Sequence, residues 1–225
     1  NAPSLSDAFS AAGYDTAYIG KWHLDGHGRS SYIPPERRQG FDFWRVLECT
    51  HDYNHSYYYA GDDPTPRLWE GYDAEAQTRC AQEYIRQHDK DRPFLLVLSW
   101  GPPHNPYDTA PQRFKDMYDP EKLVLRPNVT LNRQDRPYRR HTLEPRQELA
   151  GYYAHISALD ACLGDLLQTL DERGLAENTI FVYTSDHGDM LWSHGEWRKQ
   201  WPYDESILAP FLLRCPALFG SSGRV

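Results

Sequence analysis

The sequence predicts an α/β fold, a three-layer α/β/α sandwich around a mostly parallel central sheet. Segments with helical spacing of apolar residues alternate with short segments that are almost wholly apolar. Strands of that kind are typical of a sheet that is covered on both faces. The 225 residues, 40% of them hydrophobic, suit one domain with a sizeable core. No internal repeat or low-complexity tract interrupts the pattern.

The first predicted unit is a helix that leads into a strand. Ser4 is a suitable N-cap for a helix over residues 4–12, and Gly13 follows as a stop signal. Residues 16–19 then predict a short strand, because Thr, Tyr and Ile favour extended backbone.

The second unit repeats this order. Ala76, Cys80 and Tyr84 recur at helical spacing within residues 73–88, and the apolar strand 94–100 follows. The position of Cys80 predicts a role in core packing rather than redox chemistry. The four cysteines form no C-x-x-C pair, so the sequence gives no sign of a zinc site.

The third unit has the longest predicted helix. Apolar residues recur at helical spacing over residues 146–170, and Cys162 is one of them. Gly174 stops the helix and a strand follows at 180–184. A last strand is predicted at 211–214.

Two long segments, residues 25–72 and 101–142, interrupt the regular units. They are rich in Pro, Tyr and His and poorly periodic, and loops of such length in a compact domain are usually functional. Their one basic cluster is expected to be a solvated loop that could also contact an anionic substrate. Its members are Arg133, Arg136, Arg139, Arg140, His141 and Arg146.

Composition excludes several classes of function. A net charge of −8 argues against general nucleic-acid binding, which requires a broad basic surface. No apolar run approaches the roughly 18 residues of a transmembrane helix. The chain begins with Asn1 and carries no signal segment, so it is expected to be a piece of a longer protein.

Each predicted strand is followed by a polar or cationic group. Lys21 and His23 follow the first strand, His104 follows the second, and Asp186 and His187 follow the third. In open α/β folds, ligands bind in the crevice outside the carboxyl ends of the strands. We therefore expect these side chains to converge.

Asp186 and His187 allow two interpretations. The Asp-His-Gly sequence makes an ordinary strand-to-loop turn, and it also offers an oxygen and a nitrogen ligand to a metal ion. Together with Lys199 downstream and the groups above, a metal-assisted site for a tetrahedral anion is favoured, since fixed cations stabilise a transferring anionic group.

The sequence resembles the type I, formylglycine-dependent sulfatases. The resemblance rests on residues 13–24 (GYDTAYIGKWHL), the Pro102-Pro103-His104 turn, residues 184–188 (TSDHG), and Arg198-Lys199 followed by residues 203–206 (YDES). These motifs occur in the order of the family across almost the whole chain. The resemblance implies an alkaline-phosphatase-like fold, a calcium ion and hydrolysis of a sulfate ester.

The resemblance also implies a role for each site residue. Lys21 would bind sulfate oxygens, and His23 would hydrogen-bond the formylglycine nucleophile. His104 and Lys199 would lie near the bridging oxygen, with His104 as the proton donor. Asp186 and His187 would be metal ligands, although an imidazole leaves the identity of the metal open, since calcium prefers oxygen.

The sequence departs from the family pattern at its front. No cysteine or serine fits the C/S-x-P-x-R motif that yields formylglycine, and nothing before Lys21 resembles the paired metal-binding aspartates of the family. We therefore expect residues 1–225 to be a partial catalytic domain without its N-terminal strand, nucleophile segment and C-terminal subdomain. As given, this piece is expected to be inactive.

Three functions remain open from the sequence. The parent protein could hydrolyse a sulfate ester of a sugar or small alcohol, or a phosphodiester or phosphonate monoester through a similar cationic site. It could also be a non-catalytic anion-binding homologue. The family resemblance favours the sulfatase, with a periplasmic or secreted location; oligomeric state and exact substrate stay undetermined, and no nucleic-acid or membrane partner is expected.

Overall fold

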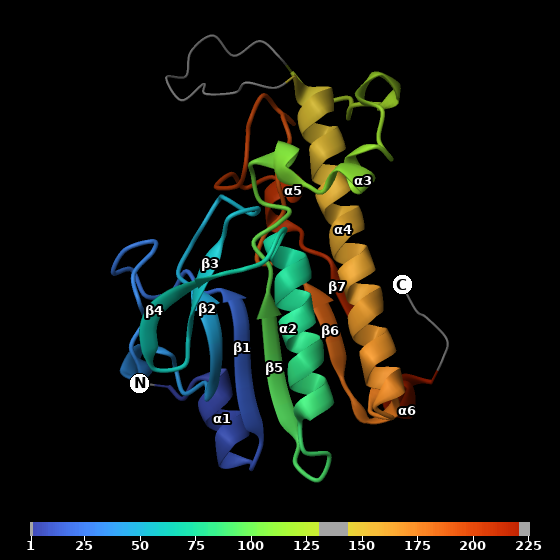
Figure 1. Ribbon diagram of the computed structural model, residues 1–225. Coiled ribbons are helices and arrows are strands. Elements are labelled where there is room, and N and C mark those ends of the chain that lie inside the picture. The colour runs from blue at the N-terminus through green and yellow to red at the C-terminus, as the bar shows by residue number, and fades with distance from the viewer. Residues whose placement is uncertain (1, 131–143, 221–225) are drawn as a thin grey trace.

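The protein, described here by a computed structural model, has two β-sheets flanked by helices (Figure 1). The structure describes residues 2–130 and 144–220. The larger sheet has the strand order β4-β3-β2-β1-β5. Its strands are β1 (Asp15–Lys21), β2 (Phe43–Leu47), β3 (Tyr57–Ala60), β4 (Asp63–Leu68) and β5 (Phe94–Ser99).

The larger sheet is mixed. β1 is parallel to β2 and to β5, with Lys21 opposite Leu47 and Gly20 opposite Ser99. The β2–β3 and β3–β4 pairs are antiparallel. A second, two-stranded sheet pairs β6 (Phe181–Thr184) with β7 (Phe211–Arg214) in antiparallel register. The predicted α/β class is confirmed, and the parallel pairs are those that β1 forms with β2 and β5.

The predicted helices are confirmed to within a few residues at each end. Ser4 caps the first helix, accepting from the backbone N–H of Asp7, whose carboxylate accepts in turn from the Ser4 N–H. The helices are α1 (Leu5–Ala11), α2 (Asp73–Gln87), α3 (Gln112–Lys115), α4 (Pro145–Glu172), α5 (Asp204–Ile207) and α6 (Pro216–Phe219).

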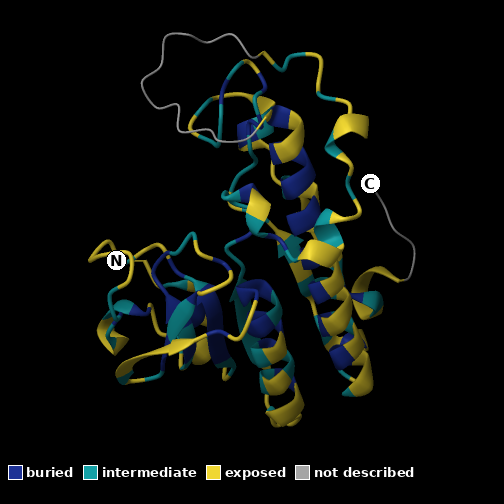
Figure 2. Ribbon diagram, turned by 45° about the horizontal axis from the view of Figure 1, so that its top comes forward, coloured by how far each residue is buried: buried dark blue, intermediate teal, exposed yellow. Residues whose placement is uncertain are grey.

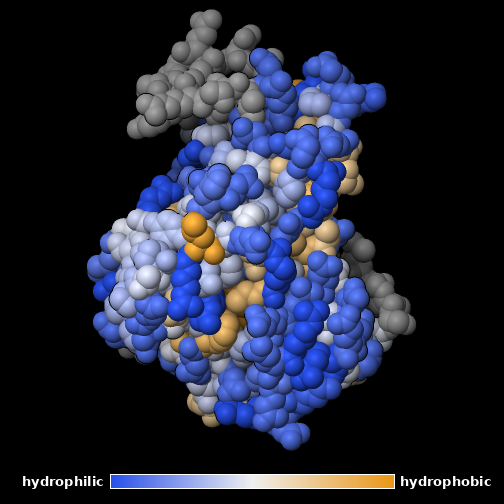
Figure 3. Space-filling view, viewed as in Figure 1, coloured by the Kyte–Doolittle hydropathy of each residue, from blue (hydrophilic) through white to orange (hydrophobic). Residues whose placement is uncertain are grey.

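The two long helices, α2 and α4, pack against each other, with α2 over β1 and β5 of the larger sheet and α4 in front of the smaller sheet (Figure 1). Ile19 of β1, Ile85 of α2 and Leu170 of α4 share one buried cluster. Figure 2 shows both helices buried on one side and exposed on the other. Their outer surface is largely hydrophilic in Figure 3, as expected for amphipathic helices.

An aromatic cluster covers the other face of the larger sheet. Tyr18 of β1 and Trp44 of β2 pack there with Trp22, Ile33 and the ring of Phe41, all from the segment between the two strands. Each buried aromatic ring removes a large apolar area from water. β1 is therefore buried on both faces, as its apolar sequence predicts.

The segment 25–72 is more regular than its sequence predicts, and the interpretation of it as an irregular loop was wrong. It contains β2, β3 and β4, which extend the sheet beyond β1. β4 carries Pro64 and Pro66, which lack the N–H that a central strand requires but are tolerated at an edge. Gly61, with φ +52°, makes the turn of the β3–β4 hairpin.

The segment 101–142 has little regular structure where it is described. It contains short helical turns and α3, which packs against α4. Most of the predicted basic cluster falls in residues 131–143, outside the described residues. Arg146 lies in the first turn of α4, where its Nε donates to the backbone oxygen of Leu123 at 3.1 Å.

Both cysteines predicted to lie in the core do so. Cys162 of α4 is buried, and Cys80 of α2 packs against the cluster around Ile85. All four cysteines are free thiols. Burial raises the pKa of Cys80 to about 11, so this thiol is unreactive at neutral pH.

The smaller sheet has an exposed apolar face. Val182 lies opposite Leu213, and both are exposed together with Ile180 and Phe211 on the same face. The alternate residues Phe181 and Tyr183 point the other way, and Phe181 packs against the cluster around Leu170. Among the described residues, no helix combines the length and apolarity that a bilayer crossing requires.

Candidate active site

The end of β1 brings Lys21 between the carboxyl ends of its two neighbours. Gly20 has φ +108°, and a Cβ atom there would lie 2.1 Å from the backbone oxygen of Ser99 in β5. Only glycine fits so close an approach. Lys21 pairs with Leu47 at the end of β2, and the extended pairing continues where the His23 N–H donates to the Glu48 oxygen at 2.8 Å.

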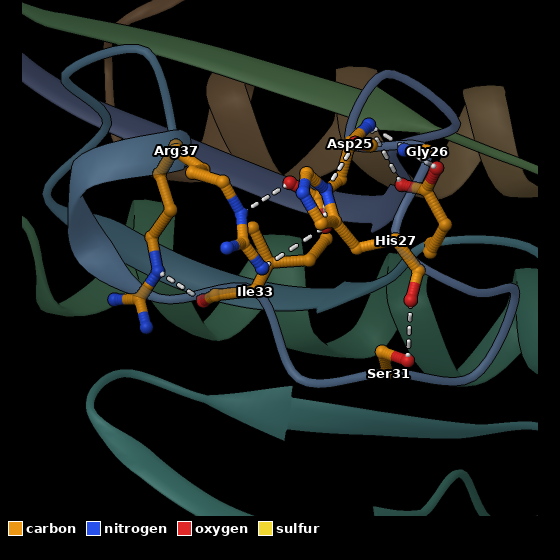
Figure 4. Close-up of polar contacts among 8 residues, drawn as sticks. Asp25, Gly26, His27, Ser31, Ile33 and Arg37 are labelled. Carbon is orange, nitrogen blue, oxygen red and sulfur yellow. Dashed lines mark hydrogen bonds and ion pairs between the residues drawn. The ribbon is translucent and has the colours of Figure 1, made fainter.

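The loop after His23 is anchored by a buried carboxylate. Glu48, 3% exposed, accepts from the backbone N–H groups of Asp25 and Gly26 at 3.1 and 3.0 Å (Figure 4). The Asp25 carboxylate is itself buried and pairs with Arg37, whose Nε lies 2.6 Å from Oδ1. Bidentate pairs of this kind fix geometry well. The loop backbone is therefore held close to the end of β2.

Two further hydrogen bonds hold the far side of the same loop. The Ser31 hydroxyl donates to the backbone oxygen of His27 at 3.0 Å, and the buried Arg38 donates through Nε to the oxygen of Ile33 at 2.9 Å (Figure 4). The loop that presents His23 and Arg29 is thus fixed at both of its ends.

The turn after β5 presents His104. Its Nδ1 lies 3.0 Å from the backbone oxygen of Asn105. A carbonyl oxygen only accepts, so Nδ1 carries the proton and Nε2 is left to face the site. The His104 ring stacks on the His51 ring, with centroids 4.8 Å apart and planes inclined by 18°. It lies edge to face with the His187 ring, with centroids 6.4 Å apart. Burial lowers the pKa of His104 to about 3, assisted by Lys199 and Lys21.

Asp186 and His187 lie just beyond β6 with their polar atoms together. His187 Nδ1 is 2.6 Å from the Gly188 oxygen, so Nδ1 donates and Nε2 keeps its lone pair. That Nε2 lies 3.4 Å from Asp186 Oδ2. Two electron-pair donors at this spacing suit a shared cation. Among the described residues, no group of three or more such side chains surrounds one point, so these two fit part of a ligand set.

Lys199 lies in an irregular segment after β6. Its neighbours Arg198 and Gln200 have φ +64° and +86°, which turns the chain sharply at this point. Burial and the positive charge of Lys21 lower the pKa of Lys199, whereas Asp186 and Asp189 raise it. The two ammonium groups are therefore close enough to repel each other.

The six predicted site residues gather at one edge of the sheets. The carboxyl ends of β1, β5 and β6 point the same way in Figure 1. Burial lowers the pKa of His23, and the charges of Lys21 and Lys199 lower it further. The charge of Lys199, which follows β6, therefore acts on His23, which follows β1. His104 meets His187 directly. The ends of β5 and β6 therefore lie close together, whereas the convergence of all six residues on one pocket and their roles stay predictions.

The structure adds residues that the sequence did not single out. His51 stacks on His104, and Arg29 contacts His51 through Nη2 at 3.2 Å. Asp189 is half-buried and accepts from the Tyr107 hydroxyl at 2.7 Å. Arg198 adds a fourth positive charge, with its guanidinium 3.8 Å from the Trp197 ring centroid. A correct assignment of β2 would have placed His51 near a strand end.

The aromatic side chains of the β3–β4 hairpin pack locally. Tyr58 stacks on Trp69 with ring centroids 3.8 Å apart, and Trp69 is 8% exposed. The Tyr59 hydroxyl donates to the Ser30 oxygen at 2.8 Å. Tyr57 lies edge to face against Tyr59. These rings therefore stabilise the β3–β4 hairpin and its contact with the loop after β1.

Comparison with curated proteins identifies close relatives. The chain is 47% identical over 222 residues to an ulvan-active sulfatase from Formosa agariphila, covering 97% of this chain and 42% of the relative. It is 29% identical over 246 residues to an endo-4-O-sulfatase from Bacteroides thetaiotaomicron, covering 96% of this chain and 46% of the relative. The chain thus spans less than half the length of these curated relatives.

Comparison with solved structures gives the same picture. The sulfatase yidJ from Bacteroides fragilis is 32% identical, with a TM-score of 0.84 over 96% of this chain and 50% of that one. The fold is the alkaline-phosphatase-like α/β fold of the sulfatases. The Sulfatase family model matches residues 1–222. The chain therefore belongs to the sulfatase family.

Proposed function

We propose that the parent protein is a sulfuric ester hydrolase that cleaves the sulfate ester of a sugar. The observation that supports this most is the meeting of strand ends, where His104 after β5 contacts His187 after β6 and the positive charges of Lys21 and Lys199 both act on His104. Like charges at short range destabilise each other unless an anion binds between them. A sulfate group is such an anion, and cations fixed around it stabilise the negative charge that develops in the transition state.

Each residue then has a chemical task. Lys21 and Lys199 bind the sulfate oxygens, and His23 hydrogen-bonds the nucleophile. His104 presents Nε2 to the bridging oxygen, because its Nδ1–H donates to Asn105. In the net reaction, the bond between sulfur and the sugar oxygen breaks. Water supplies a hydroxyl group to the sulfur and a proton to the leaving sugar oxygen. Burial, together with the charges of Lys199 and Lys21, keeps the free His104 ring neutral, and a bound anion would offset these charges and favour protonation of the ring.

Asp186 and His187 would supply two ligands to a divalent cation, with calcium as the ion that the family resemblance implies. Their convergent Oδ2 and Nε2 atoms support this assignment. When bound, the cation would offset negative charge on the sulfate and on the nucleophile. The nucleophile would be a formylglycine of the parent protein, since residues 1–225 contain no C/S-x-P-x-R motif.

The substrate class follows from the relatives. The relative from Formosa agariphila is named for activity on ulvan, and the one from Bacteroides thetaiotaomicron is an endo-4-O-sulfatase. We therefore propose a sulfated glycan as the substrate. The net charge of −8 over these 225 residues argues against a nucleic acid as a partner.

The test is sulfate release by the full-length parent protein. Ulvan and a panel of monosulfated sugars are incubated with it, and free sulfate is measured by ion chromatography. A phosphodiester and a phosphonate monoester of the same alcohol are run beside them. Faster turnover of the sulfate ester supports the proposal. Faster turnover of a phosphorus ester contradicts it, and binding of sulfate without any turnover points to a non-catalytic homologue.

A further inference from the structure

Arg29 is an exposed cation on the anchored loop after β1. Its backbone oxygen accepts from the Cys49 N–H at 2.9 Å, which ties this position to the end of β2. Its Nη2 lies 3.2 Å from His51 Nε2 and 3.2 Å from the Cys49 sulfur. The position of the guanidinium is therefore set by contacts on both its backbone and its side chain.

Within residues 2–130 and 144–220, no carboxylate pairs with Arg29. The acids of its own neighbourhood have other partners. Asp25 pairs with Arg37, and Glu48 accepts from two backbone N–H groups. The hydrogen bonds of Arg29 in this part of the chain use Nη2, so Nε and Nη1 have no partner among the described residues. A planar guanidinium suits a carboxylate or sulfate as a two-pronged donor.

His51 lies between Arg29 and His104 of the proposed reaction centre. Arg29 contacts His51, and His51 stacks on His104 at 4.8 Å between ring centroids. The charge of Arg29 also contributes to lowering the pKa of His23. A glycan whose sulfate ester lies beside His104 would therefore extend its next substituent or its neighbouring sugar along His51 toward Arg29.

Positive charge extends from the proposed reaction centre to the far side of His51. Burial lowers the pKa of His51 to about 4, and the charges of Arg29 and Arg198 lower it together with those of Lys21 and Lys199. The carboxylates of Asp186 and Asp189 act on Lys199, whereas Arg29 has no carboxylate partner among the described residues. A second negative group on the substrate would be attracted to Arg29.

We propose that Arg29, together with the face of His51 that it contacts, forms a second anion subsite for an acidic group beside the scissile sulfate ester. The subsite takes the carboxylate of a uronic acid or a second sulfate on the glycan. This inference rests on the proposed function and narrows its substrate class to glycans with at least two negative groups.

The experiment uses the full-length parent protein and three disaccharides with the same scissile sulfate. The first carries a uronic acid carboxylate on the adjoining sugar, the second is its methyl ester, and the third has a second sulfate there. Arg29→Gln keeps an amide donor toward His51 and removes the charge. We expect it to raise KM for the carboxylate or disulfated sugar by about 10- to 100-fold, the effect of one charged hydrogen-bond pair. KM for the methyl ester stays unchanged.

Arg92→Gln is the matched control. Arg92 pairs with Asp15 at the opposite end of β1, so its loss leaves every KM unchanged. The carboxylate and disulfated arms show which acidic group the subsite prefers. An equal effect of Arg29→Gln on the acid and its methyl ester overturns the subsite and leaves the sulfatase activity standing.

KM values of the wild-type protein give a second, independent test of the subsite. The subsite requires a lower KM for the carboxylate than for its methyl ester, with the difference shrinking at high salt. Identical KM values for the two would refute the subsite even if Arg29→Gln failed to fold. Absence of sulfate release from all three disaccharides, from ulvan and from monosulfated sugars would instead refute the proposed function.

Discussion

His51 and His104 stack face to face, with ring centroids 4.8 Å apart and planes inclined by 18°. His51 follows β2 and His104 follows β5, so the stack joins the ends of two strands that flank β1. The Asn105 oxygen fixes the tautomer of His104, and the stack fixes the plane of its ring. His51 is therefore a positioning residue for His104.

Replacing His51 should slow the reaction through this stack. We expect His51→Ala to lower kcat by about 10-fold, the loss of roughly 1.4 kcal/mol of orientation. His51→Phe keeps an aromatic face and should recover most of that rate. The measurement is kcat with a monosulfated sugar, which separates the stack from the proposed second anion subsite. Equal losses in the two variants would argue against positioning by stacking.

Lys199 should matter most in the transition state. Lys199→Ala removes a charge beside the leaving oxygen, and we expect kcat/KM for a sulfate ester to fall by about 100- to 1,000-fold. Lys122→Ala is the matched control, because Lys122 is exposed and pairs with Asp119 far from the site. An unchanged kcat/KM in Lys199→Ala would remove Lys199 from the mechanism.

Gly20 should be the least tolerant glycine of the sheet. Gly20→Ala places a methyl group 2.1 Å from the Ser99 oxygen at φ +108°, and we expect a loss of about 3 kcal/mol or more. Gly13→Ala is the comparison, since Gly13 has φ +86° and nothing within 4 Å of its Cβ position. It should cost about 1 kcal/mol. Chemical denaturation of the full-length protein measures both, and similar losses would contradict the steric argument.

Asp73 should make stability depend on pH. Burial raises the pKa of Asp73 to about 7, against 3.8 for an ordinary aspartate, although hydrogen bonds from Ser56 and Ala74 oppose the shift. Its Oδ1 finds no partner among the described residues. The folded state thus favours the protonated acid. The free energy of unfolding is therefore highest below about pH 4, where Asp73 is protonated in both states. It falls as the pH rises from about 4 to about 7 and is constant above that.

Asp73→Asn tests this dependence directly. An amide cannot ionise, so the variant should lose the fall between about pH 4 and 7 and gain up to about 4 kcal/mol relative to wild type at pH 8. Urea unfolding of the full-length protein across this range gives the free energies. Asp171→Asn, on the exposed side of α4, is the control and should leave the profile intact. A profile of Asp73→Asn that matches wild type would contradict the assignment.

Removal of the divalent cation should abolish turnover. Treatment of the full-length protein with a chelator should stop sulfate release, and calcium should restore it. Asp186→Asn weakens one ligand and should raise the calcium concentration needed for half recovery by at least about 10-fold. Asp91→Asn, on an exposed turn before β5, should leave it unchanged. Restoration by zinc but not calcium would reassign the metal, for which the imidazole of His187 is a suitable ligand.

The sequence predicts the parts of the site that strands present. β1, β5 and β6 are short, apolar and followed at once by polar residues, so Lys21, His104 and Asp186 could be placed at one edge of a sheet before any contact was known. Periodicity and strand ends are local properties of the chain. The convergence of these side chains then follows from the general geometry of α/β sheets.

The parts that the sequence does not predict depend on contacts between distant segments. β2, β3 and β4 carry Pro, Tyr and Arg where a strand pattern expects alternation. Packing of Trp44 against Tyr18 supports β2, and the stack of Tyr58 on Trp69 supports the β3–β4 hairpin. His51 acquires its role only when β2 and β5 flank β1. The close contact between Arg29 and His51 spans 22 positions along the chain and has no local signature.

The way in which Glu48 anchors the loop after β1 has a consequence for how this family diversifies. Its carboxylate binds the backbone N–H groups of Asp25 and Gly26, and these donors exist whatever side chains the loop carries. Mutations at exposed loop positions such as 29 therefore leave the anchor intact. Paralogues could acquire new substrate preferences by single substitutions on a loop whose path is already fixed, without first losing and regaining a stable fold.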